Sequence, residues 1–147
     1  MSKQEQLKLG RLGDFIGFRL RRVQNHLAKD FENATKDYNL RSGLFSSLAL
    51  IAANPGVSQN EVAKTVGLDK SVAVQIIDEL EHRGLARRER SKVDRRRHAL
   101  YITDEGQIFL NELFDILDDN EKRVLRQMSD SEQSLLKALL DRIYDVL

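Results

Sequence analysis

The spacing of apolar residues along the chain predicts a protein built mainly from helices. Between residues 12 and 34, apolar side chains recur in steps of three and four, which is the period of an amphipathic helix. One long helix is therefore expected over Leu12, Ile16, Leu20, Val23, Leu27, Phe31 and Ala34. A shorter helix follows at Leu44, Phe45, Leu48, Ile51 and Ala52, and the triplet Asn54-Pro55-Gly56 ends it because proline cannot continue a helix.

Two more helices, separated by a short turn, are predicted between residues 58 and 84. Ser58 and Glu61 have the spacing of a capping box, in which each side chain satisfies a free backbone N–H at a helix start. Gly67 ends that helix, and Asp69 is a suitable cap for the next one. The second helix carries Val72, Ala73, Ile76, Ile77 and Leu80 at helical spacing, and Gly84 lies just past its end. Two helices about three residues apart predict a helix-turn-helix.

After Gly84 the pattern changes to that of a basic β-hairpin. Residues Leu85–Arg90 and His98–Thr103 are expected to form short strands on either side of a polar tip at residues 91–97. From Arg83 to Arg97 there are eight Lys or Arg residues and two acidic residues, a net charge of +6 in fifteen residues. A helix-turn-helix followed by such a hairpin is a winged helix in outline, and its charge favours a partner that carries phosphates.

The last part of the chain predicts two helices and an interface. Thr103, followed by two acidic residues, is expected to start a helix that extends to about Met128. Ser129 and Glu132 form a second capping box. The helix behind it carries Leu135, Leu136, Leu139, Leu140, Ile143, Val146 and Leu147. This is more apolar surface than one small domain buries, so dimerisation through both ends of the chain is expected.

Composition and charge narrow the class of protein. The chain has 147 residues, enough for one domain, and a formal net charge of +1 that is unevenly distributed. Residues 1–40 carry +3, residues 41–103 carry +4 and residues 104–147 carry −6, which indicates a nucleic-acid face in the middle of the chain. The absence of cysteine excludes disulfides and thiol-based redox sensing. There is no apolar run of 18 residues and no signal-peptide pattern, so a soluble, cytoplasmic protein without membrane contact is expected.

Catalysis and cofactor binding have little support in the sequence. His26, His82 and His98 fall in different predicted elements, and no HExxH, nucleophile-elbow or Walker-type motif is present. We therefore expect no enzymatic activity, no cofactor and no metal site. The sequence leaves open a metal site with His and carboxylate ligands contributed by two chains.

Three short motifs resemble those of MarR-type transcriptional regulators. They are Leu80-Glu81-x-x-Gly84-Leu85 in the helix-turn-helix, Asp94-Arg95-Arg96 in the hairpin, and Ile102-Thr103-x-x-Gly106 before the next helix. The resemblance implies a homodimeric winged-helix fold in which the first and last helices of two chains intertwine. A single domain over 1–147 is then expected, with dimerisation helices at 1–40 and 104–147 and a DNA-binding region at 41–103. One departure is Ser91, where the family often has an Asp that braces the wing arginines.

The second helix of the pair has an outer face suited to reading DNA. With Ile76, Ile77 and Leu80 turned inward, the residues left on the outer face include Lys70, Ser71, Val74 and Gln75. Gln75 can form two hydrogen bonds with adenine, and Val74 can contact a thymine methyl group. Ser71 suits a base or a phosphate, and Lys70 lies in the first turn, close to the DNA backbone. Asp78 shares this face but is left out of the site, because phosphates repel a carboxylate.

In the hairpin, Arg95 and Arg96 are the predicted minor-groove residues, since narrow A·T-rich grooves concentrate negative potential. The resemblance supports Arg96, whose distance from Thr103 matches the wing arginine of MarR-type proteins. Asp94 is expected to orient one of the two guanidinium groups through a bidentate pair. Arg88 and Arg90 are expected to be phosphate contacts or solvated charges, like Arg87, Lys92 and Arg97.

The predicted function is a regulator that binds a pseudo-palindromic site on double-stranded DNA, in the form of a repressor released by a small molecule. The ligand follows from the resemblance alone, because MarR-type proteins often bind aromatic acids or phenolic compounds where the dimerisation helices meet the DNA-binding region. The corresponding residues here are Phe15, Phe18, Arg19, Arg22, Phe45 and Leu48, with Arg19 or Arg22 facing an anionic group. The alternative is a constitutive architectural DNA-binding protein, which would have the same basic wing but no ligand switch.

Overall fold

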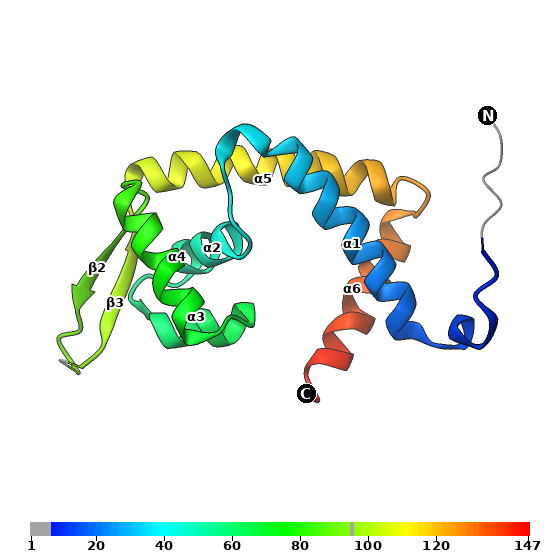
Figure 1. Ribbon diagram of the computed structural model, residues 1–147, viewed down its shortest axis with the longest axis horizontal. Helices are drawn as coiled ribbons and strands as arrows, with labels where there is room; N and C mark the ends of the chain where they lie inside the picture. Colours follow the sequence, from blue (N-terminus) through cyan, green and yellow to red (C-terminus); the bar gives the residue numbers. More distant parts are fainter. Residues whose placement is uncertain (1–6, 95) are drawn as a thin grey trace. The chain divides into compact units, whose positions relative to one another are not determined.

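The computed structural model describes residues 7–94 and 96–147 and confirms a mainly α-helical, winged-helix protein (Figure 1). In the described residues the elements follow one another as η1 (Gly10–Asp14), α1 (Ile16–Ala34), η2 (Lys36–Tyr38), α2 (Leu44–Ala53), β1 (Val57–Ser58), α3 (Gln59–Val66), α4 (Lys70–His82), β2 (Ala86–Arg90), β3 (His98–Ile102), α5 (Asp104–Leu125) and α6 (Asp130–Tyr144). None of the described helices is both long enough and apolar enough to cross a membrane.

The chain divides into two compact units. We call Ala34–Asp118 the central unit, and the residues up to Asn33 together with Asp119–Leu147 the terminal unit. The predicted boundaries were 40/41 and 103/104, so the central unit is larger at both ends. Its extra residues pack within it, because the ring of Tyr38 lies edge-on to Phe109 at 5.7 Å between centroids and Leu110 of α5 is buried.

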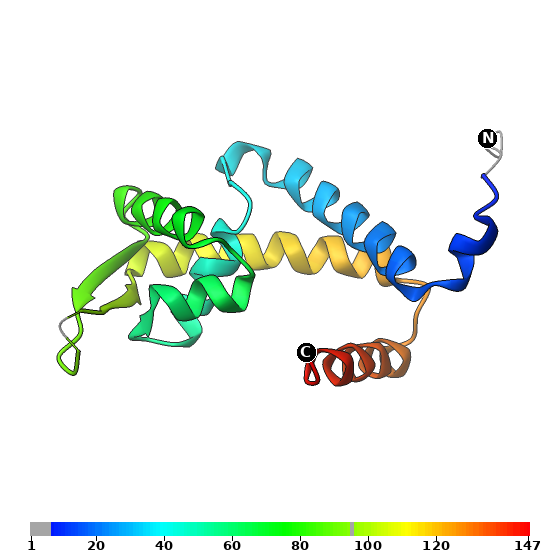
Figure 2. The ribbon, with the colours of Figure 1, turned by 60° about the horizontal axis from the view of Figure 1, so that its bottom comes forward.

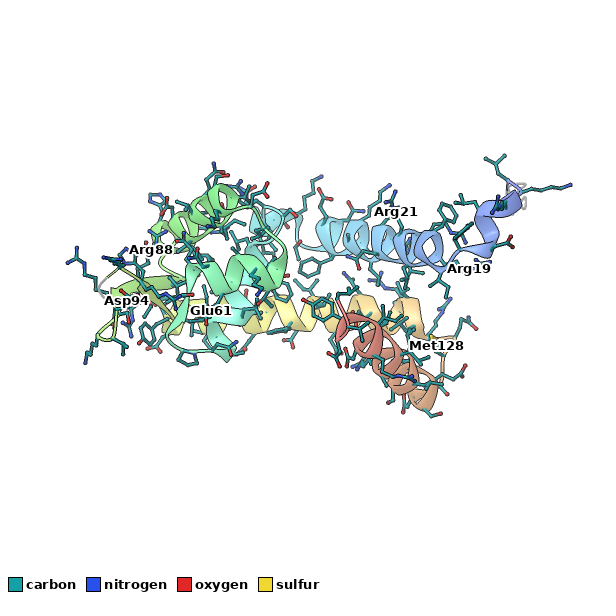
Figure 3. The ribbon with its side chains drawn as sticks, turned by 90° about the horizontal axis from the view of Figure 1, so that it is seen from below. Arg19, Arg21, Glu61, Arg88, Asp94 and Met128 are labelled. Atoms are coloured by element: carbon teal, nitrogen blue, oxygen red, sulfur yellow. The ribbon has the colours of Figure 1, made fainter. Side chains whose placement is uncertain are left out.

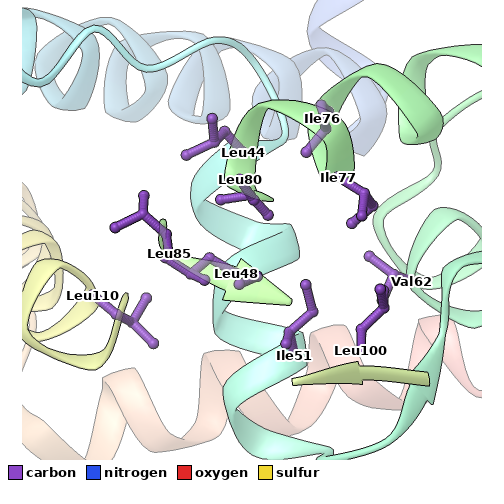
Figure 4. Packing of buried hydrophobic residues seen from close by; sticks show 11 residues of the cluster. Leu44, Leu48, Ile51, Val62, Ile76, Ile77, Leu80, Leu85, Leu100 and Leu110 are labelled. Atoms are coloured by element: carbon purple, nitrogen blue, oxygen red, sulfur yellow. The ribbon is translucent and has the colours of Figure 1, made fainter. Parts of the chain in front are cut away.

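The core of the central unit is built around α2. Leu44, Leu48 and Ile51 on this helix have no exposed surface, and they pack with apolar residues of α3, α4, α5 and the strands. Figure 4 shows this cluster, which also contains Val62, Ile76, Ile77, Leu80, Leu85 and Leu100. Full burial of each Leu or Ile stabilises the fold by about 1.5–3 kcal/mol, so this core holds α4 against the rest of the unit.

The hairpin belongs to a three-stranded antiparallel sheet with the order β1-β3-β2. The strand pair β2 and β3 agrees with the sequence prediction, and its pairing extends from Ala86 opposite Ile102 to Arg90 opposite His98 (Figure 2). The third strand was not predicted, because β1 is only two residues long and has no alternation to detect. Val57 pairs with Leu100, which joins the start of α3 to the base of the hairpin.

The motif Ile102-Thr103-x-x-Gly106 has a clear structural role in this unit. The Thr103 hydroxyl donates to the carbonyl of Gly84 at 2.6 Å and accepts from the backbone N–H of Gly106 at 3.0 Å. A Cβ on Gly106 would overlap the carbonyl oxygen of Leu85, so only glycine allows this close approach. The motif therefore fixes the start of α5 to the turn that follows α4.

The first helix of the terminal unit is shorter than the sequence predicts. Helix α1 begins at Ile16, and Leu12 lies instead in the 3-10 segment η1. Phe15 between them has extended backbone angles, φ −105° and ψ 133°, which interrupt the helix. Gly10 has a φ of +56°, and Gly13 also has low helix propensity, so this stretch lacks the residues that would continue the helix towards the N-terminus.

The second part of the terminal unit begins with the end of α5 and continues through α6. Helix α5 ends at Leu125, three residues before the predicted end at Met128. The predicted capping box at Ser129 and Glu132 is confirmed, with N–H to oxygen distances of 3.2 and 3.1 Å. The Gln133 side chain donates to the carbonyls of Leu125 and Met128, which ties α6 to the end of α5.

Candidate nucleic-acid interface

Local sequence signals build the helix pair α3 and α4. The Ser58 backbone N–H donates to the Glu61 carboxylate at 2.8 Å, and the Glu61 N–H donates to the Ser58 hydroxyl at 3.2 Å. The pKa of Glu61 is lowered, first by the backbone N–H of Ser58 and then by its side chain. Gly67 ends α3 with a φ of +82°, as predicted. Asp69 occupies the N-cap of α4 but makes no capping hydrogen bond with its side chain, so that part of the prediction was wrong.

Helix α4 has one buried face and one exposed face. Ala73, Ile76, Ile77 and Leu80 are buried in the core. The residues predicted to contact DNA are all exposed on the other face, namely Lys70, Ser71, Val74 and Gln75. Val74 has 40% of its surface exposed, which is high for an apolar residue in a well-packed unit. The core therefore presents this face outward, and its contact with DNA remains a prediction.

Gln75 has a neighbour that the sequence did not indicate. The guanidinium of Arg41, in the loop before α2, donates to Gln75 Oε1 at 3.1 Å. The same group lies 4.0 Å from Glu79 Oε2, one turn further along α4. Arg41 precedes Gln75 by 34 residues and belongs to no recognisable motif, so only the tertiary fold brings the two together.

Arg88 was predicted to be a phosphate contact or a solvated charge, but its guanidinium already binds side chains of the protein itself. Its two terminal nitrogens lie 2.7 Å from Asp78 and 2.8 Å from Glu81, and one of them donates to Gln59 at 3.2 Å. Only 21% of the side chain is exposed. Figure 3 shows Arg88 beside α4 rather than at the end of the hairpin. Arg88 therefore joins β2, α3 and α4 within the protein, and it also neutralises the Asp78 carboxylate on the outer face of α4.

The tip of the hairpin is braced through its backbone. The Ser91 hydroxyl accepts from the N–H groups of Val93 and Asp94, each at 3.3 Å. The Asp94 carboxylate accepts from the backbone N–H of Arg96 at 3.0 Å and lies 3.9 Å from Nε of Arg97. Asp94 was predicted to orient the guanidinium of Arg95 or Arg96. Its described contact with Arg96 is through the backbone N–H, and Arg95 lies outside the described residues. Figure 3 labels Asp94 at this end of the hairpin.

The remaining basic residues of the hairpin fall into two groups. Arg90 and Arg96 are exposed, as expected for residues that contact DNA, whereas Arg95 lies outside the described residues. Arg87 stacks over the ring of Tyr101 at 4.6 Å from its centroid and pairs with Glu89, so it is held on the sheet. The exposed charge available to phosphates therefore lies toward the tip of the hairpin, at and beyond the pair of Arg90 and His98.

The far end of α4 is held by a second arginine that the sequence did not single out. Arg83 donates to the carbonyls of Tyr38 at 2.8 Å and Asn39 at 3.3 Å, and it stacks over Phe109 at 5.1 Å. A shallow pocket lies here, lined by Asp37, Tyr38, Asn39, Glu79, Arg83 and Phe109. The pKa of Tyr38 is raised, first by burial and then by the neighbouring Glu112 carboxylate.

The six predicted ligand residues are divided between the two units: Phe15, Phe18, Arg19 and Arg22 belong to the terminal unit, and Phe45 and Leu48 belong to the central unit. In the terminal unit, Arg19 donates to the backbone carbonyls of Gly13 and Phe15, and Arg22 stacks over the ring of Phe18 at 5.3 Å. In the central unit, Phe45 lies edge-on to Phe114 at 5.1 Å between ring centroids. Leu48 has no exposed surface because it is part of the core, so it offers no surface to a ligand.

The described residues contain no cluster of three or more His, Asp or Glu side chains that could hold a metal ion. The hydrogen bonds and ion pairs described above link helices and strands, and none of them pairs a nucleophile with a base. The exposed side chains of α4 and of the hairpin tip offer hydrogen bonds and positive charge to a partner.

Comparisons with known proteins identify transcriptional regulators as relatives of this chain. A sequence profile of the MarR family matches residues 45–97. A protein of Thauera aromatica, whose name describes it as a transcriptional regulatory protein for the hcr operon, is 33% identical over 140 residues, covering 95% of this chain and 84% of its own. The transcriptional repressor CouR bound to a 23-mer DNA duplex has a TM-score of 0.84 and 34% identity, covering 95% of this chain and 99% of that one. CouR from Rhodococcus jostii RHA1 bound to p-coumaroyl-CoA has a TM-score of 0.81 and 32% identity, covering 91% and 94%.

Proposed function

Since this chain belongs to the MarR family of transcriptional regulators, we propose that it acts as a homodimer that binds a pseudo-palindromic DNA site and is released by a small aromatic ligand. Family membership also confirms that the protein is a regulator and not an enzyme. The features that remain to be assigned are the parts of the chain that contact DNA, the dimer surface and the ligand.

The observation that carries the DNA proposal is the exposed face of α4 next to a hairpin whose exposed arginines, Arg90 and Arg96, lie toward its tip. Lys70, Ser71, Val74 and Gln75 are exposed because the opposite face of α4 is buried. An α-helix of this kind fits the major groove, where base edges differ, and arginines at the hairpin end suit the adjacent minor groove. We assign base contacts to α4, minor-groove and phosphate contacts to Arg90, Arg95 and Arg96, and a positioning role to Arg88.

The dimer proposal rests on the terminal unit. In this unit Asn120 is the only buried residue among those described, while Ile16, Leu20 and Val23 of α1 and the leucines of α6 remain exposed. An apolar surface of this extent indicates an interface. A two-fold dimer uses the same surface on both copies, and it would place two α4 helices on two half-sites of a palindrome.

The ligand proposal follows from relatives and from the pair Phe18 and Arg22. CouR, with about a third of its residues identical to this chain, binds an aromatic acyl-CoA thioester. Arg22 stacks on Phe18, and the described residues show no ion pair or hydrogen bond for its guanidinium, which leaves its donors free for an anion. Arg19 already donates to two backbone carbonyls. We therefore propose an aromatic acid, free or as its CoA thioester, with Arg22 as the partner of its anionic group.

The DNA proposal is tested by selecting bound sequences from a random pool with the full-length protein. The expected result is an inverted repeat with half-sites about 10 bp apart, because two recognition helices must enter successive major grooves on one face of the duplex. Enrichment of a single unrepeated half-site would rule out the dimer geometry. The absence of any enrichment would favour the constitutive architectural protein instead.

The ligand proposal is tested by titrating p-coumarate and p-coumaroyl-CoA against a preformed complex of protein and selected DNA. The Arg22→Ala variant should keep its DNA affinity within a few-fold, yet require about tenfold more ligand for release, because a charge-assisted hydrogen bond contributes roughly 1.5–3 kcal/mol. Arg21→Ala, which removes a neighbouring exposed arginine on α1 (Figure 3), is the matched control and should behave as the wild type. Equal release from both variants would exclude Arg22, and release by neither compound would exclude this ligand class.

A further inference from the structure

The contact between Arg41 and Gln75 assigns a role to a residue outside the recognition helix. Arg41 lies between η2 and α2, and its Nη2 donates to Gln75 Oε1 at 3.1 Å. Its Nη1 is 4.0 Å from Glu79, so the same guanidinium faces two successive outer positions of α4. Glu79 in turn is 3.7 Å from Arg83, which is fixed to the backbone carbonyls of Tyr38 and Asn39.

This contact determines which end of the Gln75 amide faces which way. The two ends of a glutamine amide look alike and differ only in hydrogen bonding, one accepting and the other donating. An arginine can only donate, so the atom that faces Arg41 must be the oxygen. The Nε2 group of Gln75 then faces away from Arg41, and the described residues show no partner for its two hydrogens, while Oε1 keeps one lone pair.

An amide held in this way matches the major-groove edge of adenine. Adenine presents N7 as an acceptor and the N6 amino group as a donor, and a glutamine reads both by donating from Nε2 and accepting at Oε1. The lone pair that Arg41 leaves on Oε1 is sufficient for the second bond. A long exposed side chain otherwise loses rotamer freedom on binding, and a partner that orders it beforehand reduces that loss.

We propose that Arg41 is a positioning residue that sets base specificity through Gln75. This inference rests on the proposed function, in which α4 enters the major groove. A direct phosphate contact by Arg41 is the competing role. The geometry favours positioning, because the two terminal nitrogens of Arg41 face Gln75 and Glu79, and the Glu79 carboxylate offsets the charge that a phosphate would need.

The test measures binding of the full-length protein to the DNA site that the wild type selects and to its single-base variants. Gln75→Ala first identifies the base pair at which discrimination is lost. Arg41→Met, which keeps an unbranched apolar stem but has no donors, should reduce discrimination at that same base pair about tenfold, the size expected for a bidentate base contact. The slope of affinity against salt concentration should stay unchanged, and the double variant should be no worse than Gln75→Ala alone.

Two further variants separate positioning from other roles. Arg41→Lys retains a donor and should restore part of the lost discrimination. Arg90→Met removes an exposed hairpin arginine and should instead weaken binding to all sequences equally, with a lower salt slope. Thermal unfolding of each variant checks that the fold is kept, which is expected because Arg41 is exposed.

A uniform loss of affinity in Arg41→Met, additive with Gln75→Ala and accompanied by a lower salt slope, would make Arg41 a phosphate contact and overturn the proposal. So would unchanged discrimination. If the wild type selects no sequence at all, the proposed function itself fails, which is a different outcome from selection of a site whose specificity ignores Arg41.

Discussion

The central and terminal units both carry leucines at helical spacing, but the leucines are buried in the central unit and exposed in the terminal unit. In the central unit, Leu44 and Leu48 on α2 have no exposed surface. In the terminal unit, Leu135 and Leu139 on α6 expose 59% and 43% of theirs. The difference lies in what surrounds each helix. Helix α2 is enclosed by α3, α4 and the sheet, whereas each described helix of the terminal unit keeps one apolar face open.

The central unit therefore completes its own core, and we propose that the terminal unit completes its core with a second copy of the chain. Stability of the first should then be independent of protein concentration, and stability of the second should depend on it.

The dimer surface gives the largest expected effect. Placing charges in the apolar stripe of α6 with Leu139→Glu and Ile143→Glu should dissociate the dimer, because a buried carboxylate without a partner is strongly unfavourable. A monomer holds only one half-site, so DNA affinity should fall by about 100-fold or more. Sedimentation and DNA titration would measure the two effects. Lys137→Glu adds the same charge to the same helix and serves as the control, and a dimer that survives the double change would place the interface elsewhere.

Truncating one leucine in each unit sharpens the comparison. Leu48→Ala should lower the free energy of unfolding by about 2–5 kcal/mol at every protein concentration, because it leaves a cavity in a closed core. Leu135→Ala should have an effect that grows as the protein is diluted, since its partner atoms come from the second copy. Urea denaturation at several concentrations would measure both. The comparison fails if the Leu48 effect varies with concentration or if the Leu135 effect does not.

Two arginines on one face of β2 should respond in opposite ways. Arg88 is paired with Asp78 and Glu81, so Arg88→Ala should lower the free energy of unfolding by about 1–3 kcal/mol by leaving those carboxylates unpaired. Arg90 is exposed, so Arg90→Ala should leave stability unchanged and lower the salt slope of DNA binding by about one unit. Thermal unfolding and DNA titrations in a salt series would separate the two. A reduced salt slope in Arg88→Ala would return Arg88 to the phosphate contacts.

The smallest effects concern the capping boxes, one in each unit. Ser58→Ala and Ser129→Ala should each cost about 1 kcal/mol, the usual value for losing a cap. The pKa values of Glu61 and Glu132 are lowered below 4.5 by the backbone N–H groups of Ser58 and Ser129. Each carboxylate therefore stabilises the fold above about pH 4.5, and this stability is lost as the pH falls through the lowered pKa. At neutral pH, Glu61→Gln and Glu132→Gln should each have a lower free energy of unfolding than the wild type, and that free energy should fall less as the pH is lowered. Acid denaturation measures this, and a profile identical to that of the wild type would show that the carboxylate does not stabilise the fold.

Several features of the fold were correctly predicted because their causes are local. The capping boxes at Ser58 and Ser129 form as their spacing predicts, and Gly67 ends α3 where a left-handed residue is needed. The buried stripe Ile76, Ile77 and Leu80 follows directly from helical periodicity. Each of these signals needs only residues within about one or two turns of each other, so the linear sequence contains all of the information.

The roles of individual charged residues depended on partners that are distant in the sequence. Arg88 was predicted to be a phosphate contact or a solvated charge, but folding brings Gln59, Asp78 and Glu81 around its guanidinium. Asp94 was predicted to orient the guanidinium of Arg95 or Arg96, and in the folded hairpin it accepts from the backbone N–H of Arg96 and lies 3.9 Å from Nε of Arg97.

The sequence by itself therefore determined where the helices of the central unit lie, which face of α4 is buried and that the terminal helices carry surplus apolar surface. Only the tertiary structure decided which arginines are free, that β1 joins the sheet, and that Arg41 meets Gln75 across 34 residues. The reason is physical. Helix starts, helix ends and periodicity arise from short-range hydrogen bonding and burial, whereas the pairing of a long flexible side chain depends on which atoms the completed core places within its reach.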